Sequence, residues 1–338
     1  MAYETAFHRR QTYKGIGREI NVPVGQFDYT TLPDLNWGTY DQEMTSYIDS
    51  KEMIDGKEVV TRNRIPYPHS KYIVRDDTNF PLGIVGKDYV SVQNSEVFSF
   101  VKGLGEFDLD MVVERAGIME GGRTVWCLCK MPSLSLELGT DALESRLLVA
   151  NGLIGNRNYI VIPQTRRPSC SNFLSMIVKG RNGKVGLSKG WSIRHSTNMA
   201  DRMLEARTSI IQTIEAWNST QEIVEIMAGT KAPDDFIVDL IAATFGEKKG
   251  SKKGDTLAEN RNKAIYRNLQ SETSKGLTTE GSIWSEFNAV TEWLDHESII
   301  RSENKEEARF ENNLFDGPSI QKKERAFDYA YSIAAALA

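Results

Sequence analysis

The hydrophobic pattern of the chain changes near residue 195, and this change limits the possible folds more than any other feature. Before it, short β-branched runs are separated by Gly, Pro and Asp, which is typical of strands joined by tight turns. After it, apolar residues recur about every 3.6 positions, as expected for helices. Strands followed by helices predict an α+β fold, with a largely antiparallel sheet and hairpins in the N-terminal half and a helical C-terminal half.

The expected strands are separated by recognisable turn residues. Gly121-Gly122 marks the clearest hairpin, between 110–118 and 123–130. In 123–130 a two-residue period places Trp126 and Leu128 on the face opposite Val125, Cys127 and Cys129. The expected strands are 58–64, 71–75, 82–86, 88–92, 110–118, 123–130, 146–151 and 158–163, with strand material in 183–195.

Helices are predicted from capping residues and from the 3.6-residue period. Asn94 is expected to cap a helix that ends near Gly103. A short helix is expected over Ser171–Val178, after Pro168. In the C-terminal half the first helix follows residue 195, and a capping-box spacing at Ser219–Glu222 opens the second. The remaining expected helices are 233–246, 256–272, 282–297 and 319–337.

These elements divide the chain into three regions. Residues 1–57 are expected to be irregular, 58–195 to form a strand-rich core domain, and 196–338 to form a helical region. Within the last region, 246–255 is rich in Lys and Gly and is expected to be a mobile loop.

Composition indicates an ordinary globular protein, with 40% hydrophobic and 26% charged residues. No run is long enough to span a membrane, and the N-terminus lacks the apolar core of a secretory signal. Three cysteines cannot form an even disulfide framework. We therefore expect a cytoplasmic protein with reduced thiols and no membrane partner.

One long segment carries no negative charge although the chain as a whole is acidic. From Ser145 to Ala200 there are nine Lys or Arg residues and no Asp or Glu, whereas the whole chain has 46 acids and 41 bases. A positive surface with interleaved aromatic residues is typical of nucleic-acid binding, because phosphates pair with the cations and bases stack on the rings. The candidate nucleic-acid-binding residues are Arg146, Arg157, Tyr159, Arg166, Arg167, Lys179, Arg181, Lys184, Lys189, Trp191 and Arg194.

A second interpretation of the same segment needs no DNA. Its cations can pair with acids from elsewhere in the chain, since neighbours in sequence need not be neighbours in space. Both interpretations remain open at the level of the sequence.

Motifs of common enzymes are absent. The sequence contains no GxxxxGK[ST], no GxGxxG after a strand, no HExxH and no GxSxG. Cys127 and Cys129 have no second pair at zinc-ligand spacing, so they read as small apolar residues of a strand. We expect no catalytic residues, no metal and no cofactor.

Several segments together resemble the phage/plasmid-like protein family known as domain of unknown function 932. They are RDDTNFPLGIVGKDYVSVQN (75–94), AGIMEGGRTVW (116–126), RRPSCSNFL (166–174), SIRHSTNMADRMLEAR (192–207) and NAVTEWLDH (288–296). One turn departs from the family pattern, because residues 151–155 read NGLIG where many members have His-Asp-Gly-Ser after the Asn. The resemblance implies an origin in a phage or plasmid.

The order of strands, hairpin and helices, without an ATP site, is also similar to phage single-strand annealing proteins of the Redβ/RecT/Sak kind. That similarity implies an ATP-independent protein that binds and anneals single-stranded DNA during recombination. It also implies a homo-oligomeric ring or filament, with a phage exonuclease or a host single-strand-binding protein as further partners. The alternatives are an anti-defence or regulatory factor that binds a host protein, a nuclease or other enzyme, and a structural or packaging role.

Overall fold

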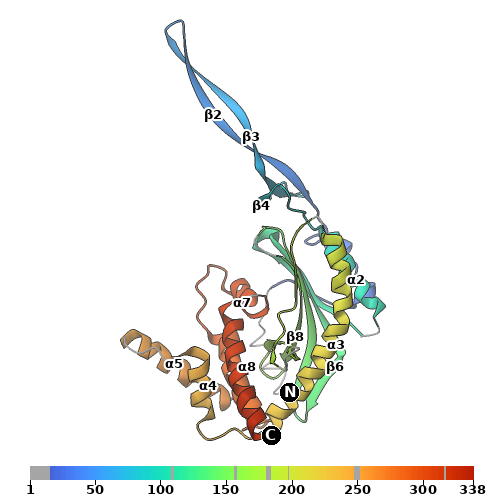
Figure 1. Cartoon of the computed structure of the whole chain (residues 1–338), viewed down its shortest axis with the longest axis vertical. Coiled ribbons are helices and arrows are strands. Elements are labelled where there is room, and N and C mark those ends of the chain that lie inside the picture. The colour runs from blue at the N-terminus through green and yellow to red at the C-terminus, as the bar shows by residue number, and fades with distance from the viewer. Residues whose placement is uncertain are drawn as a thin grey trace.

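The protein is described from a computed structural model, which covers residues 16–107, 110–155, 158–179, 184–196, 198–246, 252–315 and 317–338. Figure 1 shows a twisted sheet with helices on both of its faces and a long hairpin that extends from one end. The strands lie in the N-terminal half and most helices in the C-terminal half, so the expected α+β class is confirmed.

The main sheet has seven strands within the described residues, and its pairings are antiparallel. The strand order is β1-β5-β6-β7-β8-β12, and β9 also pairs with β8. The strands are β1 (Arg18–Pro23), β5 (Val112–Met119), β6 (Thr124–Leu138), β7 (Asp141–Gly152), β8 (Tyr159–Arg167), β9 (Asn172–Ser175) and β12 (Trp191–Ile193). A separate small hairpin joins β10 (Ile177–Lys179) and β11 (Val185–Leu187).

Helices cover the two faces of this sheet unequally. The larger core lies on the face of Val125, Cys127 and Cys129, and the smaller core lies on the face of Trp126 and Leu128. The two-residue alternation predicted for this strand is therefore confirmed. The helices are α2 (Asn94–Gly103), α3 (Met199–Gly229), α4 (Phe236–Phe245), α5 (Lys252–Leu269), α6 (Ile283–Glu292), α7 (Lys305–Leu314) and α8 (Pro318–Leu337).

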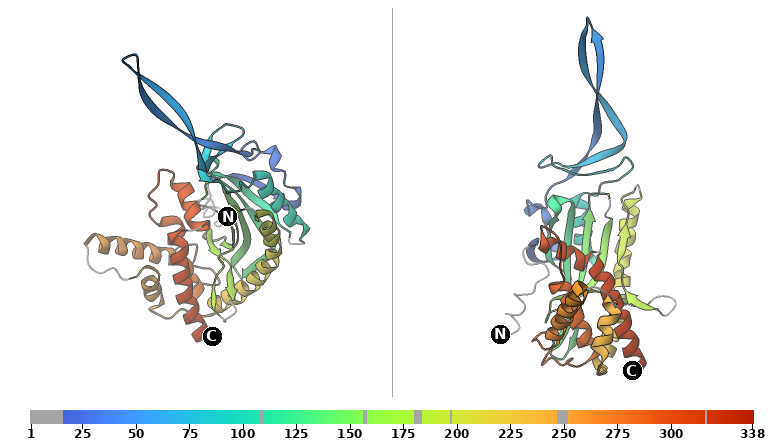
Figure 2. Two further views of the ribbon diagram at one scale, coloured as in Figure 1. Left: turned by 45° about the horizontal axis from the view of Figure 1, so that its top comes forward. Right: turned by 90° about the vertical axis from the view of Figure 1, so that its left-hand side faces the viewer.

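A third sheet forms most of the projecting hairpin. It consists of β2 (Thr39–Ile54), β3 (Lys57–Arg75) and β4 (Pro81–Gly86), in that order. The views in Figure 2 agree that β2 and β3 extend well beyond the rest of the protein. The expectation of an irregular segment through residue 57 is wrong here, because β2 is paired with β3 over nearly its whole length.

The segment Ser171–Val178 is not the helix that the sequence predicts. A turn after Pro168 places Ser171 at φ 57°, and the chain then returns along β8 as strand β9, followed by β10. Pairing with an existing sheet edge satisfies the backbone of this segment and overrides its local helical preference. The expected strand 88–92 is likewise absent, because the residues between β4 and α2 form turn and coil.

In the helical half, two expected helices are joined into one, and one helix is present that the sequence did not predict. α3 continues through Ser219–Glu222, so this capping-box spacing lies inside a helix. α7 was not predicted, although Asn304 accepts a hydrogen bond from the backbone N–H of Glu307 at its first turn. The expected loop 246–255 lies partly outside the described residues, and its end from Lys252 belongs to α5.

Thr220 lies inside the expected capping box and connects α3 to the small hairpin. Its buried Oγ1 accepts the backbone N–H of Ile177 at 2.8 Å and donates to the carbonyl of Ala216 at 2.7 Å. The hydroxyl thus links a neighbouring strand to an uninterrupted turn of α3.

Replacing this hydroxyl gives a direct stability test. In Thr220→Val, the N–H of Ile177 stays buried without its acceptor, so we expect a loss of about 1–3 kcal/mol in the free energy of unfolding. Urea titrations followed by circular dichroism measure it. The control Thr61→Val, at an exposed position of β3, should change stability by less than about 0.5 kcal/mol. Equal losses in both variants would contradict this role of Thr220.

Candidate nucleic-acid interface

Arg167 is buried at the end of β8 and is neutralised within the protein. Its guanidinium lies 2.8–3.0 Å from both carboxylate oxygens of Asp141, and Thr279 donates a further hydrogen bond to the same carboxylate at 2.8 Å. Burial by itself would lower the pKa of Arg167, but Cys170 and Asp141 outweigh burial and raise it. This arginine holds β8, the start of β7 and the helical half together.

Arg146 and Arg166 are also buried, at 1% and 2% exposure, and also face acids. Arg146 pairs with Glu114 of β5 at 2.7 Å and with Glu144 of its own strand at 2.9 Å. Arg166 lies 3.8 Å from Glu114 and donates to the hydroxyl of Ser171 at 3.1 Å. The missing acids of the basic segment are therefore supplied by residues outside it.

Tyr159 is fully buried in the larger core and packs edge-on against Phe100 at 5.8 Å between ring centroids. Burial raises the pKa of its hydroxyl well above the usual value. The structure thus corrects four of the expected DNA contacts. No surface of Arg146, Arg166, Arg167 or Tyr159 is available for a phosphate or a base.

Five candidates remain at the surface, on or next to the strands β10, β11 and β12; β10 and β11 form the small hairpin, and β12 is an edge strand of the main sheet. Lys184, Lys189 and Arg194 are exposed, and Trp191 is half-buried. Lys179 is also exposed at its side chain and pairs with Glu222 of α3 at 2.5 Å. Arg157 and Arg181 lie outside the described residues. We call Lys179, Lys184, Lys189, Trp191 and Arg194 the β12 patch.

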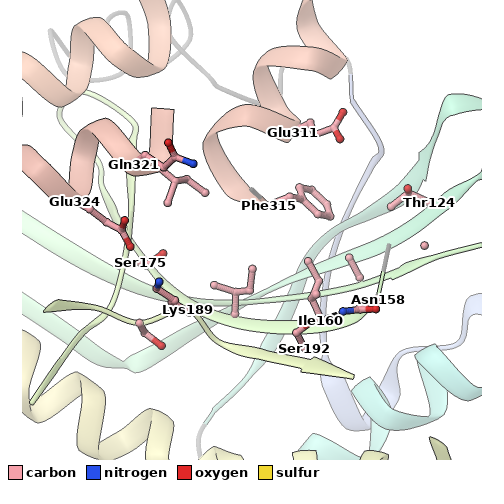
Figure 3. A pocket seen from close by; sticks show the side chains of 15 residues that line it. Thr124, Asn158, Ile160, Ser175, Lys189, Ser192, Glu311, Phe315, Gln321 and Glu324 are labelled. Atoms are coloured by element: carbon pink, nitrogen blue, oxygen red, sulfur yellow. Dashed lines mark hydrogen bonds between the residues drawn. The ribbon is translucent and has the colours of Figure 1, made fainter. Parts of the chain in front are cut away.

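A cleft of about 570 Å³ lies beside the β12 patch, between the main sheet and the helices α7 and α8. Figure 3 shows Lys189, Asn158 and Ser192 on the sheet side, facing Glu311, Phe315, Gln321 and Glu324 on the helical side. Asn158 donates to the Ser192 hydroxyl at 2.6 Å, which ties β12 to the residue before β8. Apolar side chains of β7 and β8 form the floor: Ala150, Ile160 and Ile162.

The charges of the cleft are divided between its walls. Lys189 is on the sheet wall, and Glu311 and Glu324 are on the helical wall. An anion would therefore be attracted to the β12 side and repelled from the helices. The sequence could not reveal this cleft, because α7, which contributes Glu311, was not predicted and α8 is distant in the chain.

The described part of the chain contains neither a metal-binding cluster nor a membrane-spanning helix. No group of three or more His, Cys, Asp or Glu side chains has the geometry of a metal site there. None of its helices is long and apolar enough to cross a bilayer.

The buried pair of Arg167 and Asp141 is expected to matter for stability and not for ligand binding. Arg167→Met leaves Asp141 buried without its cation and should reduce the free energy of unfolding by about 3–5 kcal/mol. Chemical denaturation of Arg167→Met and of the exposed control Arg194→Met tests this. The control should lose less than about 0.5 kcal/mol. An Arg167→Met protein as stable as the wild type would show that the pair is dispensable.

Comparison with known proteins gives one family match. The model of a family described as Domain of unknown function (DUF932) matches residues 81–314, which is well over half of the chain. The match begins at β4 and therefore excludes most of the projecting hairpin. No curated protein and no solved structure matches the chain.

Proposed function

The chain belongs to the DUF932 family, and for this member we propose ATP-independent binding of single-stranded DNA along β12, followed by annealing of complementary strands. One observation carries the proposal: the exposed cations left from the acid-free segment lie on or next to β10, β11 and β12, and one of them, Lys189, lines the wall of a cleft. A phage origin is part of the same proposal.

The proposed path of the DNA follows the charges. Lys184, Lys189 and Arg194 contact the phosphates, since they are exposed and form none of the ion pairs found in the described residues. Trp191 lies on the opposite face of β12 from the cleft, packed against the larger core. Its exposed part stacks on a base at this edge of the sheet, and such stacking is sequence-tolerant because each base has a π face. Glu311 and Glu324 repel the backbone from the helical wall and keep it on the β12 side. Bases on the outer side of the strand stay free to pair with a complement.

Neutralising the three unpaired cations tests the binding site. The change is Lys184→Gln/Lys189→Gln/Arg194→Gln, and the measurement is fluorescence-anisotropy titration of a labelled single-stranded oligonucleotide at several salt concentrations. Loss of three phosphate contacts should reduce the slope of log affinity against log salt by about 2. Trp191→Ala should weaken binding by about 1–3 kcal/mol with little change in that slope.

A matched control removes the same charge elsewhere. Lys263→Gln/Lys275→Gln/Lys305→Gln neutralises three exposed lysines of the helical half and should leave the slope unchanged. Equal effects of both triple variants would indicate a diffuse charge effect and would contradict the β12 site. No binding by the wild type at low salt would leave the alternative of a host-protein ligand for this surface.

Annealing is measured separately, by the rate at which two complementary labelled strands form duplex with and without the protein, in the absence of ATP. Acceleration by the wild type, lost in the β12 triple variant, is expected. Tight binding without faster duplex formation would show that the protein binds single strands but does not anneal them.

A further inference from the structure

The outer part of the β2–β3 hairpin lies apart from the rest of the protein in each view of Figures 1 and 2. Beyond a bulge at Glu43/Thr45, residues 45–54 of β2 pair one-to-one with 57–66 of β3. We call these residues the ribbon. None of its side chains is buried, and at about 3.3 Å per residue it extends roughly 30 Å.

Both faces of the ribbon carry exposed apolar side chains among polar ones. Ile48, Ile54, Val59 and Ile65 share one face, because they occupy alternate positions of paired strands, and they are 39–55% exposed. The other face carries Tyr47, Met53 and Val60 together with two ion pairs, Arg62 with Asp49 and Lys51 with Glu58. A lone two-stranded hairpin is at best marginally stable in water, whereas three or more strands can be stable. Further strands beside the ribbon would therefore stabilise it.

The two edges of the ribbon differ in how well they suit another strand. The edge of β3 is unpaired along the ribbon, but it runs into Pro66 and Pro68 and is covered by β4 just beyond them, at Ser70–Val74. Prolines have no N–H to donate to a further strand and are common on protected edges. β2 has no proline, and its outer edge has no partner strand within the described residues.

The net charge of the ribbon indicates which kind of partner it can bind. The ribbon and its turn, residues 45–66, contain four acids and four bases, so the net charge is zero. A DNA strand or an anionic membrane surface would require an excess of positive charge. A neutral, partly apolar strand edge fits another neutral strand edge.

We propose that β2 pairs antiparallel with β2 of a second copy of this chain, about a two-fold axis at Ser50, to form a four-stranded sheet. In this register Asp49 lies opposite Lys51 of the partner copy, and the reverse pair repeats across the axis. Tyr47 lies opposite Met53 of the partner copy. Together with the pairs inside each hairpin, charges alternate across the four strands in the order Arg62, Asp49, Lys51, Glu58.

The faces and charges of β2 favour this register, which alone places Asp49 opposite Lys51. A two-fold axis perpendicular to the sheet keeps each side chain on its own face, so residues directly opposite each other must both be odd or both be even. Moving the axis to Asp49 places that carboxylate against its own copy, and moving it to Lys51 does the same with two ammonium groups. The axis at Ser50 avoids both repulsions.

A cysteine at the axis tests the proposed register. Directly opposite residues of antiparallel strands have Cα atoms about 4.5–5.5 Å apart, which is within disulfide range. Under mild oxidation, Ser50→Cys should therefore form a disulfide-linked dimer on non-reducing gels. The native cysteines are buried and should not interfere.

The control is Thr61→Cys, which lies opposite Ser50 on β3. The two copies of residue 61 would be separated by three spacings between neighbouring strands, or about 14 Å, so this variant should not cross-link. Because Thr61 is more exposed than Ser50, random collisions would favour the control. Cross-linking of neither variant, or of both at the same rate, would overturn the register.

Charge variants test the interface without a covalent bond. Asp49→Lys and Lys51→Asp each create like charges across the axis, so neither should dimerise alone, but an equimolar mixture should form a heterodimer. Sedimentation velocity measures both results. The ion pairs lost inside each hairpin are exposed and contribute little to folding, and thermal unfolding checks this.

The inference does not rest on the proposed DNA binding, since the β12 patch is untouched by these variants. Binding of a short oligonucleotide by the charge variants should equal that of the wild type even where dimerisation is lost. A monomeric wild type, or single variants that associate as well as the wild type, would overturn the proposal. Failure of DNA binding alone would leave it standing.

Discussion

The ion pair of Arg167 and Asp141 is the constraint on which the arrangement of the two halves depends. Both side chains are removed from water, so each needs the other, and the carboxylate also accepts a hydrogen bond from Thr279. Strand β8, the start of β7 and the loop before α6 are thereby fixed to one another. A second buried pair, Lys323 with Asp295, acts in the same way, because Asp295 also accepts the backbone N–H of Phe173 in β9.

Buried ion pairs account for much of the positive charge of the acid-free segment. Three of its arginines lie next to carboxylates of strands β5 and β7, so their positive charge is neutralised inside the protein. The remaining positive surface is small and lies along β10–β12. A binding surface there is compatible with an acidic chain, because attraction of a phosphate depends on local potential and not on net charge.

The ribbon, unlike the main sheet, is not covered by the rest of the described chain. The main sheet buries both of its faces under helices, whereas the ribbon leaves both faces and both edges in water. Stability of the main sheet therefore comes from its own chain, and the ribbon gains a comparable environment only from another molecule. The two functional surfaces proposed for this protein, the β12 patch and the β2 edge, lie on different sheets.

Local sequence determined the elements whose signals are local. The Gly121-Gly122 hairpin, the alternation along β6, the helix at 94–103 and the C-terminal helix all follow from turn residues and periodic patterns, although the cap of the helix at 94–103 is Gln93 and not the expected Asn94. Tertiary structure decided the rest. Only the fold brings Glu114, Glu144 and Asp141 to the arginines, pairs 172–175 with β8, and links α3 to β10 through Thr220. These outcomes depend on contacts between residues far apart in the chain, and burial makes such contacts stronger than local preferences.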